Sequence, residues 1–184
     1  TVITQNVTIQ LDAAGNATIT AADINNGSTD NCGIATITLS KTAFDCSNVG
    51  ANTVTLTVTD VNGNVSTSTA VVTVEDKIAP TIVSKPVSVT LTASGTVSIT
   101  PQDALLSGTD NCSGTITYAL SQSTFGATDA INSPVTIQLT GTDASGNATS
   151  VPVLVTVIDP VPVVITRNIT VALDANGQVT ITPS

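Results

Sequence analysis

The sequence predicts an all-β protein made of tandem antiparallel sandwich units, joined end to end as a rod. The tetrapeptide Thr-Asp-Asn-Cys occurs at 29–32 and again at 109–112, 80 residues apart, which indicates a repeated unit. Apolar and polar residues alternate in stretches such as 53–59. Strict alternation is typical of antiparallel strands with one buried and one solvent-facing side. Repeats of this length usually form arrays that span distance or present surfaces.

The repetition extends well beyond four residues. Three segments share one strand pattern, followed in each copy by a glycine four residues later: 7–11, 87–91 and 169–173. We therefore expect the chain to be a piece of a longer protein, with immunoglobulin-like repeats at 1–79 and 80–160 and the start of a truncated third repeat at 161–184. A lone two-stranded hairpin is marginally stable in water, so the third repeat would need a neighbour to be ordered.

Each full unit is expected to hold about seven short strands, the number found in an immunoglobulin-like sandwich. In the first unit, turn residues separate the alternating stretches, and we expect no helix. The strands expected there are 6–11, 17–21, 34–40, 53–59 and 65–75. In this topology the loop before 34–40 and the hairpin after 53–59 share one end of the unit. The first turn and the exit of the last strand share the other end.

Composition excludes several classes of function. Thirteen acidic and four basic residues give a net charge of −9, so nucleic acid is not an expected partner. No apolar run reaches the roughly 18 residues of a membrane span, so no membrane insertion by this segment is expected. The chain has no His, two Phe and one Tyr, which leaves few groups for general acid–base work or for stacking on sugar rings. We expect that it is not an enzyme.

Acidic residues fall in turns and junctions, and the sandwich topology groups them. The linker at 75–80 is short and ends in proline, so it should hold neighbouring units stiffly and bring Asp76 to the acidic loops of the second unit. Calcium takes six to eight oxygen ligands of this kind, and calcium is the candidate cofactor. The alternative is that these residues are plain turn formers. The candidate metal ligands are Asp23, Asp30, Asp60, Asn62, Asp76, Asp103, Asp110 and Asp143.

The three cysteines predict a disulfide between Cys32 and Cys46. This bond would close a loop of about 15 residues and contribute about 3 kcal/mol in the chain-entropy model. It would also indicate an oxidising, extracellular location. Cys112 matches Cys32, but Ala127 stands where the second unit should repeat Cys46, so one thiol must stay free or pair between chains. The alternative is that the cysteines are small buried apolar residues.

Four segments carry a family resemblance: 28–33, 49–54, 57–64 and 74–80. They resemble hyalin-type repeats and, more closely, the tandem repeats of SprB-like giant surface adhesins from gliding Bacteroidetes such as Flavobacterium. The resemblance covers the whole chain. The second unit departs from it by lacking the second cysteine and by having Thr92 where Asp12 stands in the first. The resemblance implies export by the type IX secretion system, a place on the exterior of the outer membrane, a role in gliding motility, and a grip on surfaces or polysaccharide.

These observations lead to two expected functions. The first is a stiff extracellular stalk in a large bacterial cell-surface adhesin, with neighbouring repeats, surface polysaccharide and the secretion or gliding machinery as partners. The alternative is a module in which the loop end of each repeat binds a glycan or a protein directly. A third possibility is an accessory domain of a secreted hydrolase whose catalytic region lies elsewhere.

Overall fold

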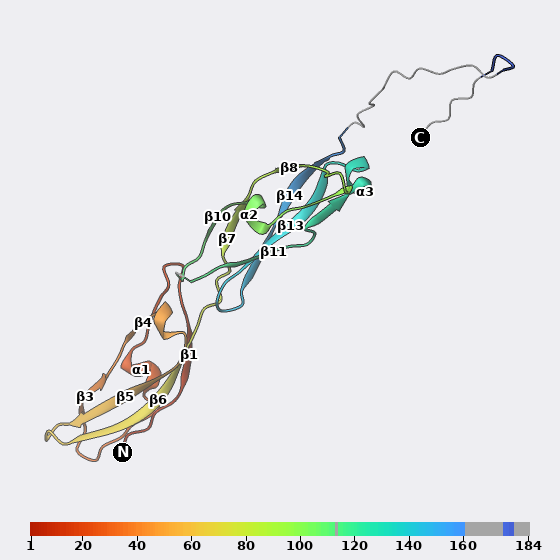
Figure 1. Ribbon diagram of the computed structural model, residues 1–184. Helices are drawn as coiled ribbons and strands as arrows, with labels where there is room; N and C mark the ends of the chain where they lie inside the picture. Colours follow the sequence, from red (N-terminus) through yellow and green to blue (C-terminus); the bar gives the residue numbers. More distant parts are fainter. Residues whose placement is uncertain (113, 161–174, 179–184) are drawn as a thin grey trace.

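The computed structural model describes residues 1–112, 114–160 and 175–178. Two β-sandwich units lie end to end and are joined by the linker at 76–80 (Figure 1). The expected third repeat falls almost wholly outside the described residues, so it stays a prediction, as do the boundaries between repeats. Within the described part, no helix is long and apolar enough to cross a membrane.

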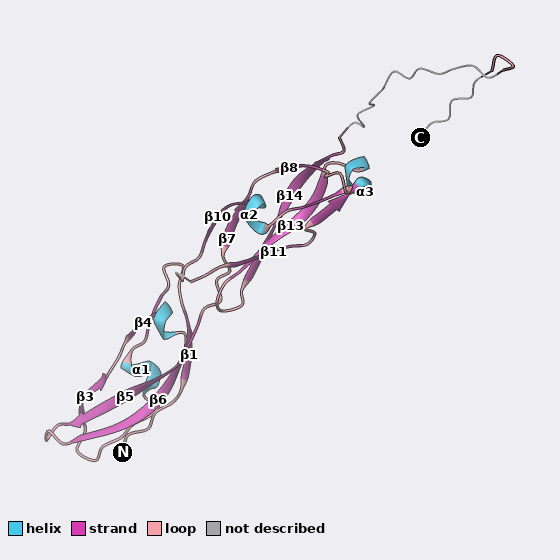
Figure 2. Cartoon of the chain, viewed as in Figure 1, coloured by secondary structure: helices cyan, strands magenta, loops and turns pink. Residues whose placement is uncertain are grey.

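The first unit is built around a four-stranded sheet in the order β1-β6-β5-β3 (Figure 2). β1 runs parallel to β6, whereas β5 is antiparallel to both of its neighbours. A short antiparallel pair, β2 with β4, forms a second layer. The elements are β1 (Val7–Gln10), β2 (Asn16–Thr18), α1 (Ala21–Ile24), β3 (Ile34–Leu39), β4 (Ala43–Asp45), the 3-10 turn η1 (Cys46–Asn48), β5 (Gly50–Asp60) and β6 (Val65–Glu75).

The second unit repeats this plan with the sheet order β11-β13-β14-β8. Again the first strand of the sheet, β8, runs parallel to the last, β14. Two further pairs, β10 with β7 and β12 with β9, form the opposite layer. The elements are β7 (Thr81–Ser84), β8 (Val87–Thr90), β9 (Thr96–Ser98), α2 (Pro101–Ala104), β10 (Leu105–Thr109), β11 (Thr117–Leu120), β12 (Thr124–Gly126), α3 (Ala127–Ile131), β13 (Val135–Thr142) and β14 (Ala148–Ile158).

Each unit has its own aliphatic core, and the alternation seen in the sequence points into it. Val54, Leu56 and Val58 on β5 are buried, while the threonines between them are partly exposed. Ile137 and Leu139 do the same on β13. Each core holds one phenylalanine, Phe44 or Phe125. The predicted all-β sandwich is therefore confirmed.

The expectation that no helix forms was wrong, because the described residues include three short α-helical turns, α1, α2 and α3, and the 3-10 turn η1. α1 and α2 each follow a threonine at the helix start and carry an aspartate at the third helical position. In α1, the backbone N–H of Thr20 donates to the carboxylate of Asp23 at 2.7 Å. In α2, the Thr100 N–H donates to Asp103 at the same distance. Helices of four residues are too short to produce a 3.6-residue apolar period, so the pattern could not reveal them.

Candidate metal centre

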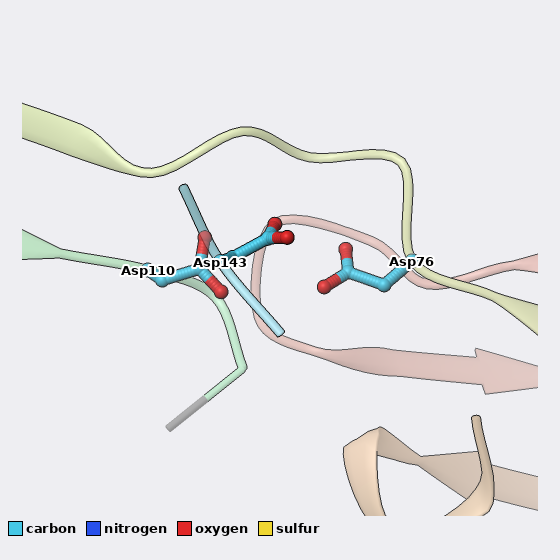
Figure 3. Close-up of side chains that lie close together, drawn as sticks. All are labelled: Asp76, Asp110 and Asp143. Atoms are coloured by element: carbon cyan, nitrogen blue, oxygen red, sulfur yellow. The ribbon is translucent and has the colours of Figure 1, made fainter. Parts of the chain in front are cut away.

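Three carboxylates meet at the junction between the two units (Figure 3). Asp76 directly follows β6, Asp110 directly follows β10, and Asp143 directly follows β13. Each contributes an oxygen, and these three oxygens lie within 4.8 Å of one another. Asp76 and Asp143 are almost fully buried, with exposed fractions of 5% and 8%. The first unit thus supplies one carboxylate and the second unit supplies two.

Local hydrogen bonds fix each carboxylate in place. Asp143 Oδ1 accepts from the backbone N–H groups of Ser145 at 2.9 Å and Asn147 at 2.8 Å, and its Oδ2 accepts from Asn147 Nδ2 at 2.8 Å. This is the usual way in which an aspartate at the start of a tight turn bonds the backbone ahead of it. Asp76 Oδ1 accepts from the N–H of Ile78 at 3.1 Å, and Asp110 Oδ2 accepts from the N–H of Cys112 at 3.1 Å. The three acidic side chains are therefore held by their loops before any ligand arrives.

Further hydrogen bonds cross the junction. Asn111 Nδ2 donates to Asp76 Oδ1 at 3.2 Å and to the carbonyl of Asp12 at 3.3 Å. Asn147 Nδ2 donates to the carbonyl of Asp76 at 3.2 Å, and the Ser145 hydroxyl donates to Asp76 Oδ2 at 3.5 Å. Side chains of the second unit therefore bind the segment that follows the last strand of the first unit.

Two buried oxygens at the same place have no hydrogen-bond donor. They are Asp110 Oδ1 and Asn111 Oδ1. A buried acceptor without a partner costs about 1 to 3 kcal/mol, and more when it is charged. Both atoms belong to the loop that carries one of the three clustered carboxylates. Acceptors of this kind are satisfied by a hydrogen-bond donor such as water or by a cation.

The negative charges of the three clustered aspartates are not balanced by nearby basic side chains in the described residues. In the described part of the chain the one ion pair joins Lys77 Nζ to Glu75 Oε2 at 3.6 Å, so none of the three clustered aspartates has a basic partner there. Two like charges about 4.8 Å apart repel by roughly 3 to 4 kcal/mol at an effective dielectric constant of about 20. A cavity of about 210 Å³ adjoins the carboxylates. Oxygen donors of this kind, with room for water, fit a hard divalent cation such as calcium.

A disulfide closes the same junction. Cys46 at the start of η1 is bonded to Cys112, which follows Asp110 and Asn111, with a Cα–Cα distance of 5.4 Å. Cys32 is free and exposed. The predicted Cys32–Cys46 bond was wrong because the two residues lie at opposite ends of the first unit. Cys32 lies just before Ile34, which pairs with Asp60 at one end of β5, whereas Cys46 lies beside Gly50 at the other.

Gly15 shows how closely the units approach. Its φ is +76°, a left-handed conformation that favours glycine. A Cβ at this position would lie 2.7 Å from Cys46 Sγ and 2.8 Å from the carbonyl oxygen of Asn111. The equivalent Gly95 has the same φ but open space around it. Among the residues that the structure describes, Gly15 is therefore needed for packing as well as for turn geometry, whereas nothing lies within 4 Å of a Cβ at Gly95.

The other predicted ligands lie elsewhere. Asp23 and Asp103 cap α1 and α2, away from the acidic cluster, and hydrogen bonds from the backbone and then the side chain of Thr20 or Thr100 lower their pKa values. Asp30, Asp60 and Asn62 lie at the far end of the first unit. There Asp60 accepts from the side chain and then the backbone of Asn64, which lowers the pKa of Asp60. Of the eight predicted ligands, the structure brings together Asp76, Asp110 and Asp143.

Sequence reasoning did not include Cys112 or Asn111 among the functional residues. A signal for Cys112 was present, because Ala127 leaves it without a cysteine to pair with inside the second unit. For Asn111 the signal was its place in the repeated tetrapeptide, beside a loop expected to face the linker.

Neither family models nor curated protein sequences match the chain. Solved structures with some likeness include human protocadherin-24 EC1-2, at 15% identity over 85% of this chain and 96% of that chain, with a TM-score of 0.39. Human mucin-like protocadherin EC1-2 matches at 14% identity over 87% and 98% of the two chains, with a TM-score of 0.37. Drosophila N-cadherin EC1-4 matches at 14% identity over 84% and 47%, with a TM-score of 0.40. Because these scores lie below 0.5, the sandwich assignment rests on the strand order described above.

Proposed function

We propose that this chain is a repeat segment of a large bacterial cell-surface adhesin of the SprB-like kind, and that it acts as a stiff extracellular stalk in adhesion and gliding motility. The observation that supports this most is the junction, where a disulfide and several hydrogen bonds join two sandwich units. A flexible linker would need none of these. Contacts of this kind hold a joint that has to transmit direction.

Stiffness follows from the number of separate points that hold the units. The linker connects them once, and the Cys46–Cys112 bond connects them a second time. Asn111 and Asn147 then bind the exit of the first unit from two different loops. Bending the junction in any direction would break at least one of these contacts, so the two units should move as one body.

Calcium is proposed to hold the two units together in addition to the disulfide and the hydrogen bonds. It would be held by Asp76, Asp110 and Asp143, with the unpartnered Asn111 Oδ1 as a further oxygen donor. The ion would neutralise the like charges that the two units bring together. Its binding would therefore favour the docked arrangement over a separated one.

The proposed location is the cell exterior, on the outer membrane surface after type IX secretion. A disulfide between units persists in an oxidising compartment, which agrees with this location. The proposed partners of this segment are neighbouring repeats, and those of the whole adhesin are surface polysaccharide and the secretion or gliding machinery. A non-enzymatic role fits a chain without His, whose acidic residues support turns or the junction.

The alternative, in which the loop end of every repeat binds a glycan or a protein, is opposed by one observation. The loop end of the second unit, with Asp110 and Asp143, is already covered by the first unit. A surface used to join repeats is not free to hold a ligand.

NMR relaxation of the amide nitrogens tests the stalk directly. We expect both units to report one shared, elongated tumbling tensor in the oxidised protein with calcium. Separate tumbling of the two units would overturn the stalk proposal. A glycan array run on the same sample distinguishes the alternative, because a spacer binds none of the arrayed sugars.

A further inference from the structure

The far end of the first unit is built like the docked end of the second. Asp60 Oδ1 accepts from the N–H groups of Asn62 and Asn64, both at 2.8 Å, and its Oδ2 accepts from Asn64 Nδ2 at 2.7 Å. This is the same set of bonds that Asp143 makes in the second unit. Asp30 likewise accepts from the N–H of Cys32 at 2.9 Å, as Asp110 does from Cys112 at 3.1 Å.

The two ends differ in what covers them. Asn31 and Cys32 are exposed, whereas Asn111 and Cys112 are partly buried against the first unit. Cys32 is a free thiol, whereas Cys112 is bonded. The tips of the two hairpins are both exposed but differ in their side chains and neighbours. Val61 is a large apolar residue with an exposed fraction of 60%. Its equivalent, Ala144, lines the junction cavity together with Val49 of the first unit.

We propose that the Cys32 end of the first unit docks onto the linker end of another repeat of the first unit's kind. Cys32 would form a disulfide with the cysteine at the Cys46 position of that repeat. The carboxylate at its Asp76 position would meet Asp30 and Asp60, as Asp76 itself meets Asp110 and Asp143. This inference rests on the observed junction, where the equivalent residues already make these contacts, and not on calcium binding or on the adhesin role.

The linker end of the second unit does not fit as the partner. Position 127, which matches Cys46, is alanine and has no thiol to offer. A second copy of this chain docked head to tail would therefore form no disulfide with Cys32. The partner must be a repeat that keeps a cysteine where the first unit has Cys46.

The bond forms by a balanced exchange with an external disulfide oxidant. The two thiols lose two protons and two electrons as their sulfurs join. The oxidant takes them up as its own sulfur–sulfur bond breaks, which yields two thiols.

A fusion protein tests the proposal on the full chain. Residues 1–80 are placed ahead of residues 1–184, so that Pro80 runs directly into Thr1 as it runs into Thr81 in the natural sequence. The fusion has five cysteines, two from the added unit and three from the chain. After oxidation by a glutathione disulfide mixture in the presence of EDTA, the proteins are alkylated and digested without reduction. Lys41 and Lys77 place Cys32 and Cys46 in separate tryptic peptides, and the chain's Cys32 peptide differs from that of the added unit because residues 78–80 precede it. The two Cys46 peptides share one sequence, and substituting Cys46 in the added unit tells them apart.

We expect two disulfides, one between Cys46 of the added unit and Cys32 of the chain, and the Cys46–Cys112 bond within the chain. Only Cys32 of the added unit should be alkylated. The matched control carries Cys46→Ala in the added unit, which mimics Ala127, and should leave both copies of Cys32 alkylated. A fusion in which Cys46–Cys112 forms while the chain's Cys32 stays alkylated overturns the proposal. Absence of both bonds overturns it as well, because the proposed junction is inferred from the Cys46–Cys112 junction. Neither outcome bears on the calcium or stalk proposals, because the experiment contains a chelator and measures no stiffness.

Discussion

Removing the bond between Cys46 and Cys112 should destabilise the protein, and the structure sets the size of the effect. The two cysteines are 66 residues apart in the chain. A cross-link that closes a loop of this length lowers the entropy of the unfolded chain by an amount worth about 4.3 kcal/mol at 25 °C. The bond crosses the junction, so its loss acts on both units together.

The variant to make is Cys46→Ser together with Cys112→Ser. For a chain of this length, 1 kcal/mol corresponds to about 2 to 4 °C, so the melting temperature should fall by roughly 9 to 17 °C. Calorimetry measures this fall, with Cys32→Ser as the matched control. The control should melt like the wild type, because Cys32 is exposed and free.

The entropic reasoning fails if the double variant melts within about 2 °C of the wild type, well below the shift expected for a loop of this length. It also fails if the control loses as much as the double variant. A single transition that divides into two in the double variant would show in addition that the bond couples the unfolding of the two units.

Three more outcomes are expected. Calcium should raise the melting temperature of the wild type, by an amount equivalent to about 2.7 kcal/mol when its concentration is 100 times the dissociation constant. Asp76→Asn should abolish that rise, whereas the control Asp103→Asn should leave it intact. Gly15→Ala should lower the free energy of unfolding, measured in urea, by at least about 1 kcal/mol more than Gly95→Ala. Both variants place alanine at a positive φ, but only the Cβ at position 15 meets atoms closer than 3.0 Å. Equal losses in the two variants would refute the close packing at Gly15. The pKa of Asp60 is lowered on folding, so its contribution to the free energy of unfolding is present above the unfolded pKa of about 3.9 and is lost as pH falls through the folded value. The free energy of unfolding should therefore drop less on acidification in Asp60→Asn than in the wild type.

The strands could be predicted because each has one buried and one exposed face. Val54, Leu56 and Val58 determine which side of β5 enters the core, and no distant contact is needed to see it. Short capped turns such as α1 leave no such period. The threonine and aspartate at their starts were the available sign, and Asp23 was instead interpreted as a possible ligand.

The acidic cluster was predictable in part for the same topological reason. A sandwich places its exit strand and its opposite loops at adjoining ends of successive units, which brings Asp76 toward Asp110 and Asp143. The Cys46–Cys112 bond arises from the same geometry, but it was not predicted. The nearness of Cys32 and Cys46 in the sequence favoured the prediction of a bond between those two residues. Cysteines 14 residues apart can lie at the two ends of a strand, whereas cysteines 66 residues apart can meet across a junction. Whether calcium occupies the cluster stays a prediction.

The Cys46–Cys112 bond also changes how the molecule would carry mechanical load. When the chain is pulled from its ends, tension reaches Cys46, passes through the two sulfurs and continues from Cys112. The long strands β5 and β6, the linker, and β7 to β10 lie between these residues and are bypassed. At roughly 3.3 to 3.6 Å per extended residue, the segment holds more than about 200 Å of chain that tension cannot draw out. Reduction would make that length available to tension as the strands between the cysteines unfold, so the oxidation state of one bond sets how far this part of the protein can stretch.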